Sequence, residues 1–330
     1  MPIRLLAVVC WCAALRVGAQ DLHFSQFYHN PMHASPALTG AFGGDLRAMG
    51  LYRSQWTSVP VSYSTFALGA DKKVLANQNF TVAAGLLVQH DKAGDAGLSW
   101  TQVGFSGSVV RALNALHSVS VGIGAGLAQR SFDISGLKFG RQWSGDVYDA
   151  SLPTNESFDQ SSGMLPTLSA GLGWQMALPD MRTGAVVGIG AFHLNQPQVG
   201  FRDDNRESLP MRFAATASST VLLSPNFDLV VFAEAWQMGT ARETLAGGGT
   251  RMWLDPGERA VRLTMAVRMG DAVIPAVQYE FGDWTVGLSY DWNTSHFETA
   301  TNGRGGFELA VLYRSLPVPP PKTFKSCPIF

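Results

Sequence analysis

The chain has 330 residues, enough for two ordinary domains or for one large barrel. Only 15% of its residues are charged, 46% are hydrophobic and 35 are glycine, whereas a typical soluble domain is roughly 25% charged. The net charge of −1 argues against nucleic-acid binding, which usually shows a basic patch. Beyond the leader no apolar run reaches the roughly 18 residues of a transmembrane helix, so the composition favours an outer-membrane β-barrel.

The start of the chain has the layout of a secretory signal. An apolar core from Leu5 to Leu15 follows a positive charge, and Val17-Gly18-Ala19 forms a small-residue cleavage site. We expect cleavage after the last of these residues, which removes Cys10 and Cys12. The mature chain then keeps only Cys327, so it cannot form an internal disulfide.

Residues 20–44 precede the first predicted strand. They are polar, rich in His, Asn and Pro, and show no sustained periodicity. We expect this segment to be periplasmic or lumenal, either folded into the lumen as a plug or covering the periplasmic mouth. Phe24, Phe27 and Tyr28 would serve as its apolar anchors, and Pro31 and Pro36 would stiffen its path.

Two groups of polar residues invite interpretation as metal sites. His23, His29 and His33 have spacings that fit no common zinc pattern. Asp203-Asp204-Asn205, in a predicted outer loop, lacks the twelve-residue pattern of a calcium loop. We interpret both groups as ordinary loop residues and expect no metal and no cofactor.

Fourteen segments are predicted as strands, most of them about 9–13 residues long, the length that a tilted strand needs to cross a bilayer. They are residues 45–53, 61–70, 80–90, 98–110, 117–130, 165–176, 183–194, 209–222, 227–238, 241–252, 260–269, 272–282, 284–293 and 306–314. In Trp284–Asn293 every even-numbered residue is large and apolar, and every odd-numbered one is small or polar. This period of two has aromatics at both ends of its apolar face, as a membrane strand requires.

The lengths of the connections predict the orientation of the barrel. The three longest gaps, 131–164, 195–208 and 294–305, all follow odd-numbered strands and therefore lie at one end. We predict that these gaps are outer loops, and that the short turns and both chain termini are periplasmic.

Glycine and serine on the predicted lumen face are interpreted as small wall residues. Gly122, Gly124 and Gly126 form G-x-G-x-G, but Leu127 replaces the third glycine of the dinucleotide pattern and no helix follows. Ser106 lacks the G-x-S-x-G spacing of a hydrolase nucleophile. We assign no catalytic residue.

Charged residues also occupy predicted lumen positions. We expect them to form a network of salt bridges and hydrogen bonds that fills or lines the barrel. The sharper alternative is a selectivity element or a contact with a plug. These residues are Glu234, Arg262, Arg268, Glu280, Asp291 and Glu308.

Four segments, residues 24–31, 35–40, 52–56 and 306–313, resemble the PorP/SprF family of type IX secretion membrane proteins. Phe24-Ser25-Gln26-Phe27-Tyr28-His29-Asn30-Pro31 is similar to the family's opening F-S-Q-aromatic and N-P segment. Ser35-Pro36-Ala37-Leu38-Thr39-Gly40 is similar to its N-P-A-x-x-G, with Ser35 in place of Asn. Tyr52-Arg53-Ser54-Gln55-Trp56 looks like its Y-R-x-Q-W, and residues 306–313 resemble its terminal strand.

The resemblance implies an outer-membrane barrel of the secretion and gliding machinery. Such a barrel supports export or surface attachment of a large secreted protein and is not an enzyme. Its expected partners are outer-membrane lipid, periplasmic machine components and the secreted cargo. The alternatives are an outer-membrane channel or hydrophobic-compound transporter with an N-terminal hatch, or a barrel enzyme with a Ser or Asp cluster at the rim.

The resemblance also singles out residues for partner contact or for a structural role. Arg53 could pair with a lumen carboxylate, and Trp56 could join the aromatic belt. The candidates are Phe24, Ser25, Gln26, Asn30, Pro31, Pro36, Gly40, Arg53, Gln55, Trp56 and Cys327.

The last predicted segment is a tail, residues 315–330, which is rich in proline. We expect it to be extended, with polyproline II character. Together with Lys322 and Lys325, residues 317–330 could dock on a periplasmic component at low ordering cost. Cys327 is either an idle thiol or a partner in an intermolecular disulfide.

Overall fold

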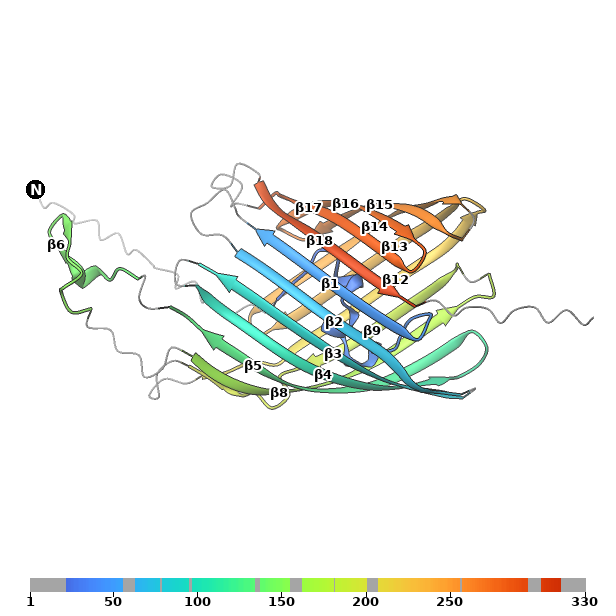
Figure 1. Ribbon diagram of the computed structural model, residues 1–330, viewed down its shortest axis with the longest axis horizontal. Coiled ribbons are helices and arrows are strands. Elements are labelled where there is room, and N and C mark those ends of the chain that lie inside the picture. Colours follow the sequence, from blue (N-terminus) through green and yellow to red (C-terminus); the bar gives the residue numbers. More distant parts are fainter. Residues whose placement is uncertain are drawn as a thin grey trace, which may run out of the picture.

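The structure, a computed structural model, describes residues 22–55, 63–77, 79–94, 97–133, 137–154, 162–180, 182–200, 207–255, 257–295 and 304–315. Fourteen antiparallel strands form a closed barrel whose strand order follows the chain (Figure 1). The first strand, β1 (Leu46–Gln55), closes the sheet by pairing with the last, β18 (Arg304–Arg314). The predicted fourteen-stranded antiparallel barrel is confirmed.

The other strands of the wall lie between these two. They are β2 (Tyr63–Ala76), β3 (Phe80–Ala93), β4 (Leu98–Ala112), β5 (His117–Ser131), β8 (Ser162–Ala177), β9 (Gly184–Phe192), β12 (Arg212–Ser224), β13 (Phe227–Met238), β14 (Ala241–Asp255), β15 (Arg259–Arg268), β16 (Ala272–Phe281) and β17 (Trp284–Asn293). Several run a few residues past their predicted ends. The largest difference is in β2, where the charged residues 71–73 interrupt the hydrophobic pattern but not the strand.

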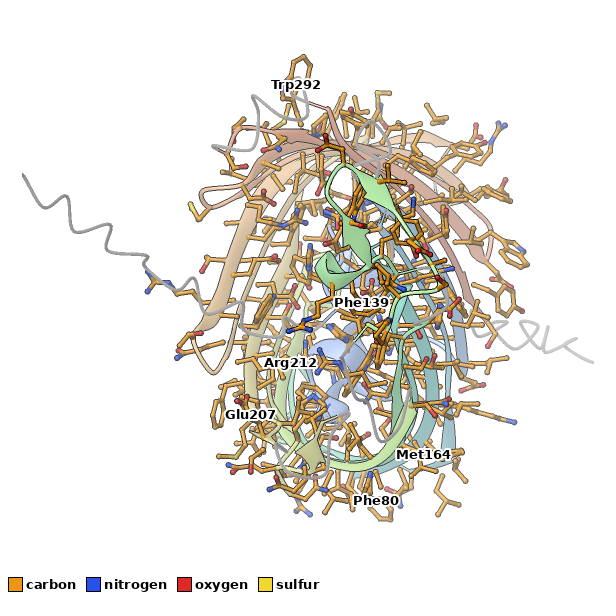
Figure 2. The ribbon with its side chains drawn as sticks, turned by 90° about the vertical axis from the view of Figure 1, so that its left-hand side faces the viewer. Phe80, Phe139, Met164, Glu207, Arg212 and Trp292 are labelled. Carbon is orange, nitrogen blue, oxygen red and sulfur yellow. The ribbon has the colours of Figure 1, made fainter. Side chains whose placement is uncertain are left out.

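The period of two in the sequence separates lipid-facing from lumen-facing side chains. In β17, Leu288 and Trp292 are exposed on the outer surface, whereas Ser289 and Asp291 are buried inside. Trp292 projects away from the wall in Figure 2. Exposed apolar side chains on the outer face of such a barrel are stabilised by lipid rather than by a protein core.

Aromatic pairs form at both ends of the outer face. At the end of the barrel where β1 begins, Trp284 packs against Tyr313 with ring centroids 5.0 Å apart. Towards the opposite end, Tyr52 packs against Phe307 at 5.8 Å. Amphipathic rings at two levels match the two interfaces of a bilayer.

The two ends of the barrel differ in their connections. The connections β5–β8, β9–β12 and β17–β18 lie at one end, called here the long-loop end. The first of these carries η3 (Gly140–Gln142), β6 (Trp143–Ser144) and β7 (Val147–Tyr148), and the second carries β10 (Gln198–Val199) and β11 (Glu207–Ser208). These elements are too short to leave a periodic pattern in the sequence. The opposite, short-turn end holds tight turns such as the one between β12 and β13.

The N-terminal part of the described chain lies inside the barrel (Figure 1). It contains η1 (Phe27–His29), α1 (Pro31–Ala34) and η2 (Pro36–Leu38). Residues 22–41 are called the plug below. Where the chain is described, it has no helix long and apolar enough to cross a membrane.

The plug crosses the lumen from one end towards the other. His23 lies 4.0 Å from Glu243 at the long-loop end, whereas Gly40 donates a hydrogen bond to Asp71 near the short-turn end. The described chain therefore starts in the long-loop half and finishes, at Ser315, at the short-turn end. The two chain termini themselves lie outside the described residues, so their periplasmic placement stays a prediction.

Plug side chains supply much of the barrel's apolar core. Phe24 and Met32 pack in a buried cluster with wall residues such as Met49 and Leu51. Phe27 packs in a second cluster formed by β13, β14, β15 and β16, and its ring lies 5.9 Å from that of Phe232. The interior is thus a packed core made by plug and wall together.

We predict that Leu288→Arg on the lipid face destabilises the barrel. Leu288 is 50% exposed near the middle of β17, and an arginine at the bilayer midplane costs about 2–4 kcal/mol. The measurement is a denaturant titration of folding in lipid vesicles. Leu113→Arg, in the β4–β5 turn, is the matched control and should fold nearly as well as the parent; equal loss in both variants would contradict the assignment of the lipid face.

Candidate functional site

The long-loop half of the lumen contains a buried cluster of two arginines and two carboxylates around Ser25. Arg53 Nη2 and Arg268 Nη1 each lie 2.6 Å from Asp291 Oδ2. The Ser25 hydroxyl donates to Asp291 Oδ1 at 2.7 Å and accepts a hydrogen bond from Arg268 Nη2 at 2.8 Å. Arg53 Nη1 also donates to Glu308 Oε2 at 3.3 Å. Arg268 also pairs with Glu243 at 3.4 Å and with Asp271 at 3.2 Å. Each charge of the cluster thus has a partner of opposite sign, which makes buried charges tolerable.

Glu308 binds the backbone of the plug directly. The amides of Ser25 and Gln26 donate to its two carboxylate oxygens, each at 2.7 Å. The Gln26 side chain donates to Ser289 Oγ at 3.3 Å and to the Glu308 carbonyl at 3.2 Å. One buried carboxylate thus satisfies two consecutive amides of a segment that has no regular partner strand.

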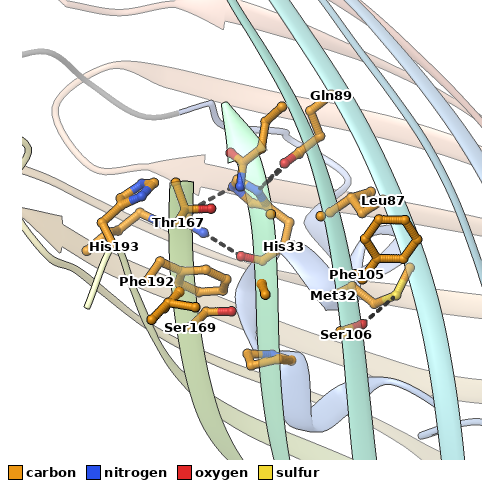
Figure 3. A pocket seen from close by; sticks show the side chains of 17 residues that line it. Met32, His33, Leu87, Gln89, Phe105, Ser106, Thr167, Ser169, Phe192 and His193 are labelled. Atoms are coloured by element: carbon orange, nitrogen blue, oxygen red, sulfur yellow. Dashed lines mark hydrogen bonds between the residues drawn. The ribbon is translucent and has the colours of Figure 1, made fainter. Parts of the chain in front are cut away.

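A second anchor holds α1 (Figure 3). Arg212 is 2% exposed at the start of β12. Its Nη1 lies 2.7 Å from His33 Nε2, and its Nη2 donates to the His33 carbonyl at 2.5 Å. His33 Nδ1 lies 3.3 Å from Gln89 Oε1 on β3. The Arg212 guanidinium also stacks over Phe192, 4.3 Å from the ring centroid. The histidine is therefore held from β12 and β3, and Arg212 is itself held by Phe192 on β9.

A third anchor lies near the short-turn end. Asp71 accepts hydrogen bonds from Arg47 Nε at 2.9 Å, from Arg47 Nη2 at 2.7 Å and from the Gly40 amide at 2.7 Å. Arg47 Nη2 also donates to the Leu38 carbonyl at 3.2 Å. Gly40 has φ +74°, and a Cβ there would lie 2.3 Å from the Ala83 Cβ, so this last turn of the plug requires glycine.

Glycines on β5, β8 and β9 line the part of the wall against which the plug packs. A Cβ on Gly122 would lie 2.4 Å from the Ala37 nitrogen, and one on Gly190 would lie 2.3 Å from the Ala34 carbonyl oxygen. A Cβ on Gly188 would approach Leu38 Cδ1 to 2.6 Å. These residues are small because the plug comes close to the wall, a reason that the sequence alone did not supply.

The lumen charges predicted from the sequence divide into two groups. Arg268, Asp291 and Glu308 come together at Ser25. This is a contact with a plug, which the sequence analysis named as one alternative for the lumen charges. Arg262 and Glu280 pair at 2.9 Å towards the short-turn end. Glu234, 5% exposed on β13, also faces the interior.

The family-like residues lie in or against the plug. Phe24, Ser25 and Gln26 contact the wall as described above, and Arg53 pairs with lumen carboxylates. Asn30 is 1% exposed at the N-terminal end of α1, Pro31 and Pro36 are the first residues of α1 and η2, and Gly40 closes the plug. Gln55, at the end of β1, pairs with Tyr63 and Gly306 across the sheet.

Other residues from the sequence analysis have plain structural surroundings or lie outside the described residues. Ser106 lies 2.7 Å from Thr39 Oγ1 as a lumen serine, and no three His, Cys, Asp or Glu side chains of the described part gather as metal ligands would. The predictions that concern residues outside the described part are those for Trp56, Cys327, Asp203-Asp204-Asn205, the leader with Cys10 and Cys12, and residues 316–330.

Sequence reasoning missed Arg47, Asp71, Gln89 and Arg212. Each has a polar side chain that faces the interior from a wall strand. A signal was present for Asp71, because its parity matches that of Ala67 and Gly69, which also face the lumen. The same signal was present for Arg212, because its parity matches that of Ala214, which also faces the lumen.

The plug divides the remaining space in the lumen. A cavity of about 50 Å³ lies beside α1, lined by residues that include Met32, Gln89, Ser106 and Thr167 (Figure 3). It can hold a few water molecules but not a solute. A cavity of about 550 Å³ lies at the short-turn end. The arrangement is suited to holding a segment of chain in place.

Comparison with known proteins identifies the sequence family and the fold. The model of the family described as type IX secretion system membrane protein PorP/SprF matches residues 17–313. No curated protein matches the sequence.

Among solved structures, a Pseudomonas aeruginosa FadL homologue is 10% identical with a TM-score of 0.51, over 84% of this chain and 92% of its own. A mutant of the TodX monoaromatic hydrocarbon channel is 11% identical with a TM-score of 0.49, over 86% and 93% of the two chains. Likeness at such low identity concerns the fold alone.

We predict that Gly122→Ala displaces the plug and destabilises the protein. The new methyl group would overlap the backbone at Pro36 and Ala37, and such overpacking typically costs about 1–3 kcal/mol. Thermal unfolding and limited proteolysis of the plug measure the effect. Gly104→Ala is the control, because its Cβ would have no atom closer than 3.9 Å; similar losses in both variants would refute the contact.

Removal of one carboxylate should be more damaging. Asp291→Ala leaves Arg53 and Arg268 without their shared partner, and breaking a buried ion pair on one side costs about 3–5 kcal/mol. The free energy of unfolding in denaturant measures this loss. The exposed Asp149→Ala serves as control; a parent-like stability of Asp291→Ala would contradict the network.

Proposed function

Because the chain belongs to the PorP/SprF family of type IX secretion system membrane proteins, we propose that it is a plugged outer-membrane barrel without enzymatic activity. It supports the export, or the attachment to the cell surface, of a large secreted protein. The observation that carries this proposal is the plug. Residues 22–41 occupy the lumen and are tied to the wall by three separate sets of buried contacts.

Because the plug fills the lumen, the barrel is better suited to docking another protein than to conducting a polypeptide. A polypeptide could pass through the lumen only if the plug left, which would break the hydrogen bonds of Glu308 to Ser25, of Arg212 to His33 and of Asp71 to Gly40. Buried polar groups that lose their hydrogen bonds are costly. The rims and loops of the barrel are therefore the proposed contact sites for other proteins.

The residues that resemble the family motifs hold the plug in place. Phe24, Ser25, Gln26 and Arg53 are all at most 2% exposed, so no partner reaches them in this state. Their proposed role is to hold the wall and plug in one shape that the secretion machinery recognises.

We place the long-loop end outside the cell, because bacterial barrels have longer outer loops than periplasmic turns. The β5–β8 connection, with its hairpin β6–β7, then faces the cargo (Figure 1). The proline-rich tail that follows Ser315 faces the periplasm and is the proposed contact, with Lys322, Lys325 and Cys327, for a periplasmic component.

A channel for hydrophobic compounds, with the plug as hatch, is the rival function. Fold likeness to a FadL homologue permits it without assigning it. The hatch would have to move, since the space beside α1 is only about 50 Å³.

We predict that a strain lacking this protein fails to export or display one large surface protein and takes up small hydrophobic compounds normally. Proteomics of the cell surface and medium, with an uptake assay on the same strains, measures both. Complementation with the parent gene is the control. Normal export combined with lost uptake would replace the secretion role with transport.

A further inference from the structure

Most of the charged residues that line the cavity at the short-turn end, called here the vestibule, are arginines. Its volume is about 550 Å³, and it lies between the plug residues Tyr28 and His29 and the wall. The charged residues that line it are Arg47, Arg182, Arg262, Arg314 and Glu280. Neither the plug contacts nor the family assignment explains this concentration of guanidinium groups.

The carboxylates of this region are covered by the arginines. The Asp228 side chain is 0% exposed and accepts a hydrogen bond from Arg182 Nη2 at 2.5 Å. The Glu280 side chain is 8% exposed and pairs with Arg262 at 2.9 Å and with Arg251. The arginine side chains keep 16–22% exposure. Asp228 is thus buried behind arginine side chains, whereas Glu280 lines the cavity together with Arg182 and Arg262.

Positive charge is left over in the vestibule. Among the described residues the cluster contains Arg47, Arg182, Arg251, Arg262 and Arg314 against Asp71, Asp228 and Glu280, which leaves a formal charge of +2. Arg314, the last residue of β18, has no side-chain hydrogen bond or ion pair with another residue of the described part. A concave site with low-dielectric walls concentrates such a field.

We propose that the vestibule binds an acidic peptide segment of another protein. Guanidinium groups recognise carboxylates with paired hydrogen bonds. The lining also includes apolar side chains, among them Phe42, Phe232 and Leu312, which suit the aliphatic stems of Glu and Asp. The volume lies within the range of about 300–1,000 Å³ that is usual for ligand pockets.

The chain's own tail does not supply this ligand. Residues 316–330 contain Lys322 and Lys325 and no Asp or Glu, so their side chains have the same sign of charge as the vestibule. The acidic segment therefore belongs to a different molecule. This inference rests on the vestibule alone and does not require the secretion role.

The test is calorimetric titration of the purified full barrel, in a non-ionic detergent at low salt, with a hexaglutamate peptide. We expect binding of hexaglutamate, none of hexalysine, and weakening as salt screens the charges. Arg314→Glu should weaken binding at least about tenfold, since it replaces an attraction with a repulsion. Arg314→Gln, which only removes the charge, should have a smaller effect.

Arg242→Glu is the matched control. Arg242 is exposed at the long-loop end of β14, so this variant has the same change of net charge far from the vestibule and should bind like the parent. The proposal is overturned if hexaglutamate does not bind, or if both Glu variants weaken binding equally. It is also overturned if inorganic phosphate at equal charge concentration displaces the peptide, which would make the vestibule a site for small anions.

Discussion

The structure depends on the buried contact between Glu308, Asp291 and the backbone and side chain of Ser25. Two carboxylates and two arginines inside a membrane barrel would be costly if they faced an empty lumen. The plug completes their hydrogen bonds, and they in turn satisfy the amides of Ser25 and Gln26. Wall and plug therefore stabilise each other, and neither has a satisfied polar interior without the other.

This dependence gives the family-like residues a physical meaning. Arg53 on β1 and Glu308 on β18 face each other across the seam where the barrel closes, and both reach Ser25. Closure of the sheet and insertion of the plug thus use the same side chains. The plug also runs the length of the lumen before it becomes β1. A hatch motion would therefore have to withdraw its N-terminal end through the lumen, unlike the opening of a lid at one rim.

Much of the wall could be predicted from sequence, because side-chain direction in a strand follows a period of two whatever the distant partners are. Trp284–Asn293 shows this directly, since every alternate residue has its predicted environment. The plug could not be placed in the same way. Ser25 and Glu308 are 283 residues apart, and no local pattern connects them. Gly122 looked like an ordinary small residue because the cause of its size, the backbone at Ala37, is equally remote. Neither the alternation of side chains along the strands nor the loop lengths indicated the direction in which the plug runs through the lumen.

Residues 22–41 are a resident part of the barrel core. Hydrogen exchange of the parent protein in lipid nanodiscs tests this most directly, through the amides of Ser25 and Gln26. We expect these amides to exchange as slowly as the amides of β17 and β18, because their acceptor is a fully buried carboxylate. Exchange at the rate of an unstructured peptide, with the strands still protected, would show that the plug is not part of the core.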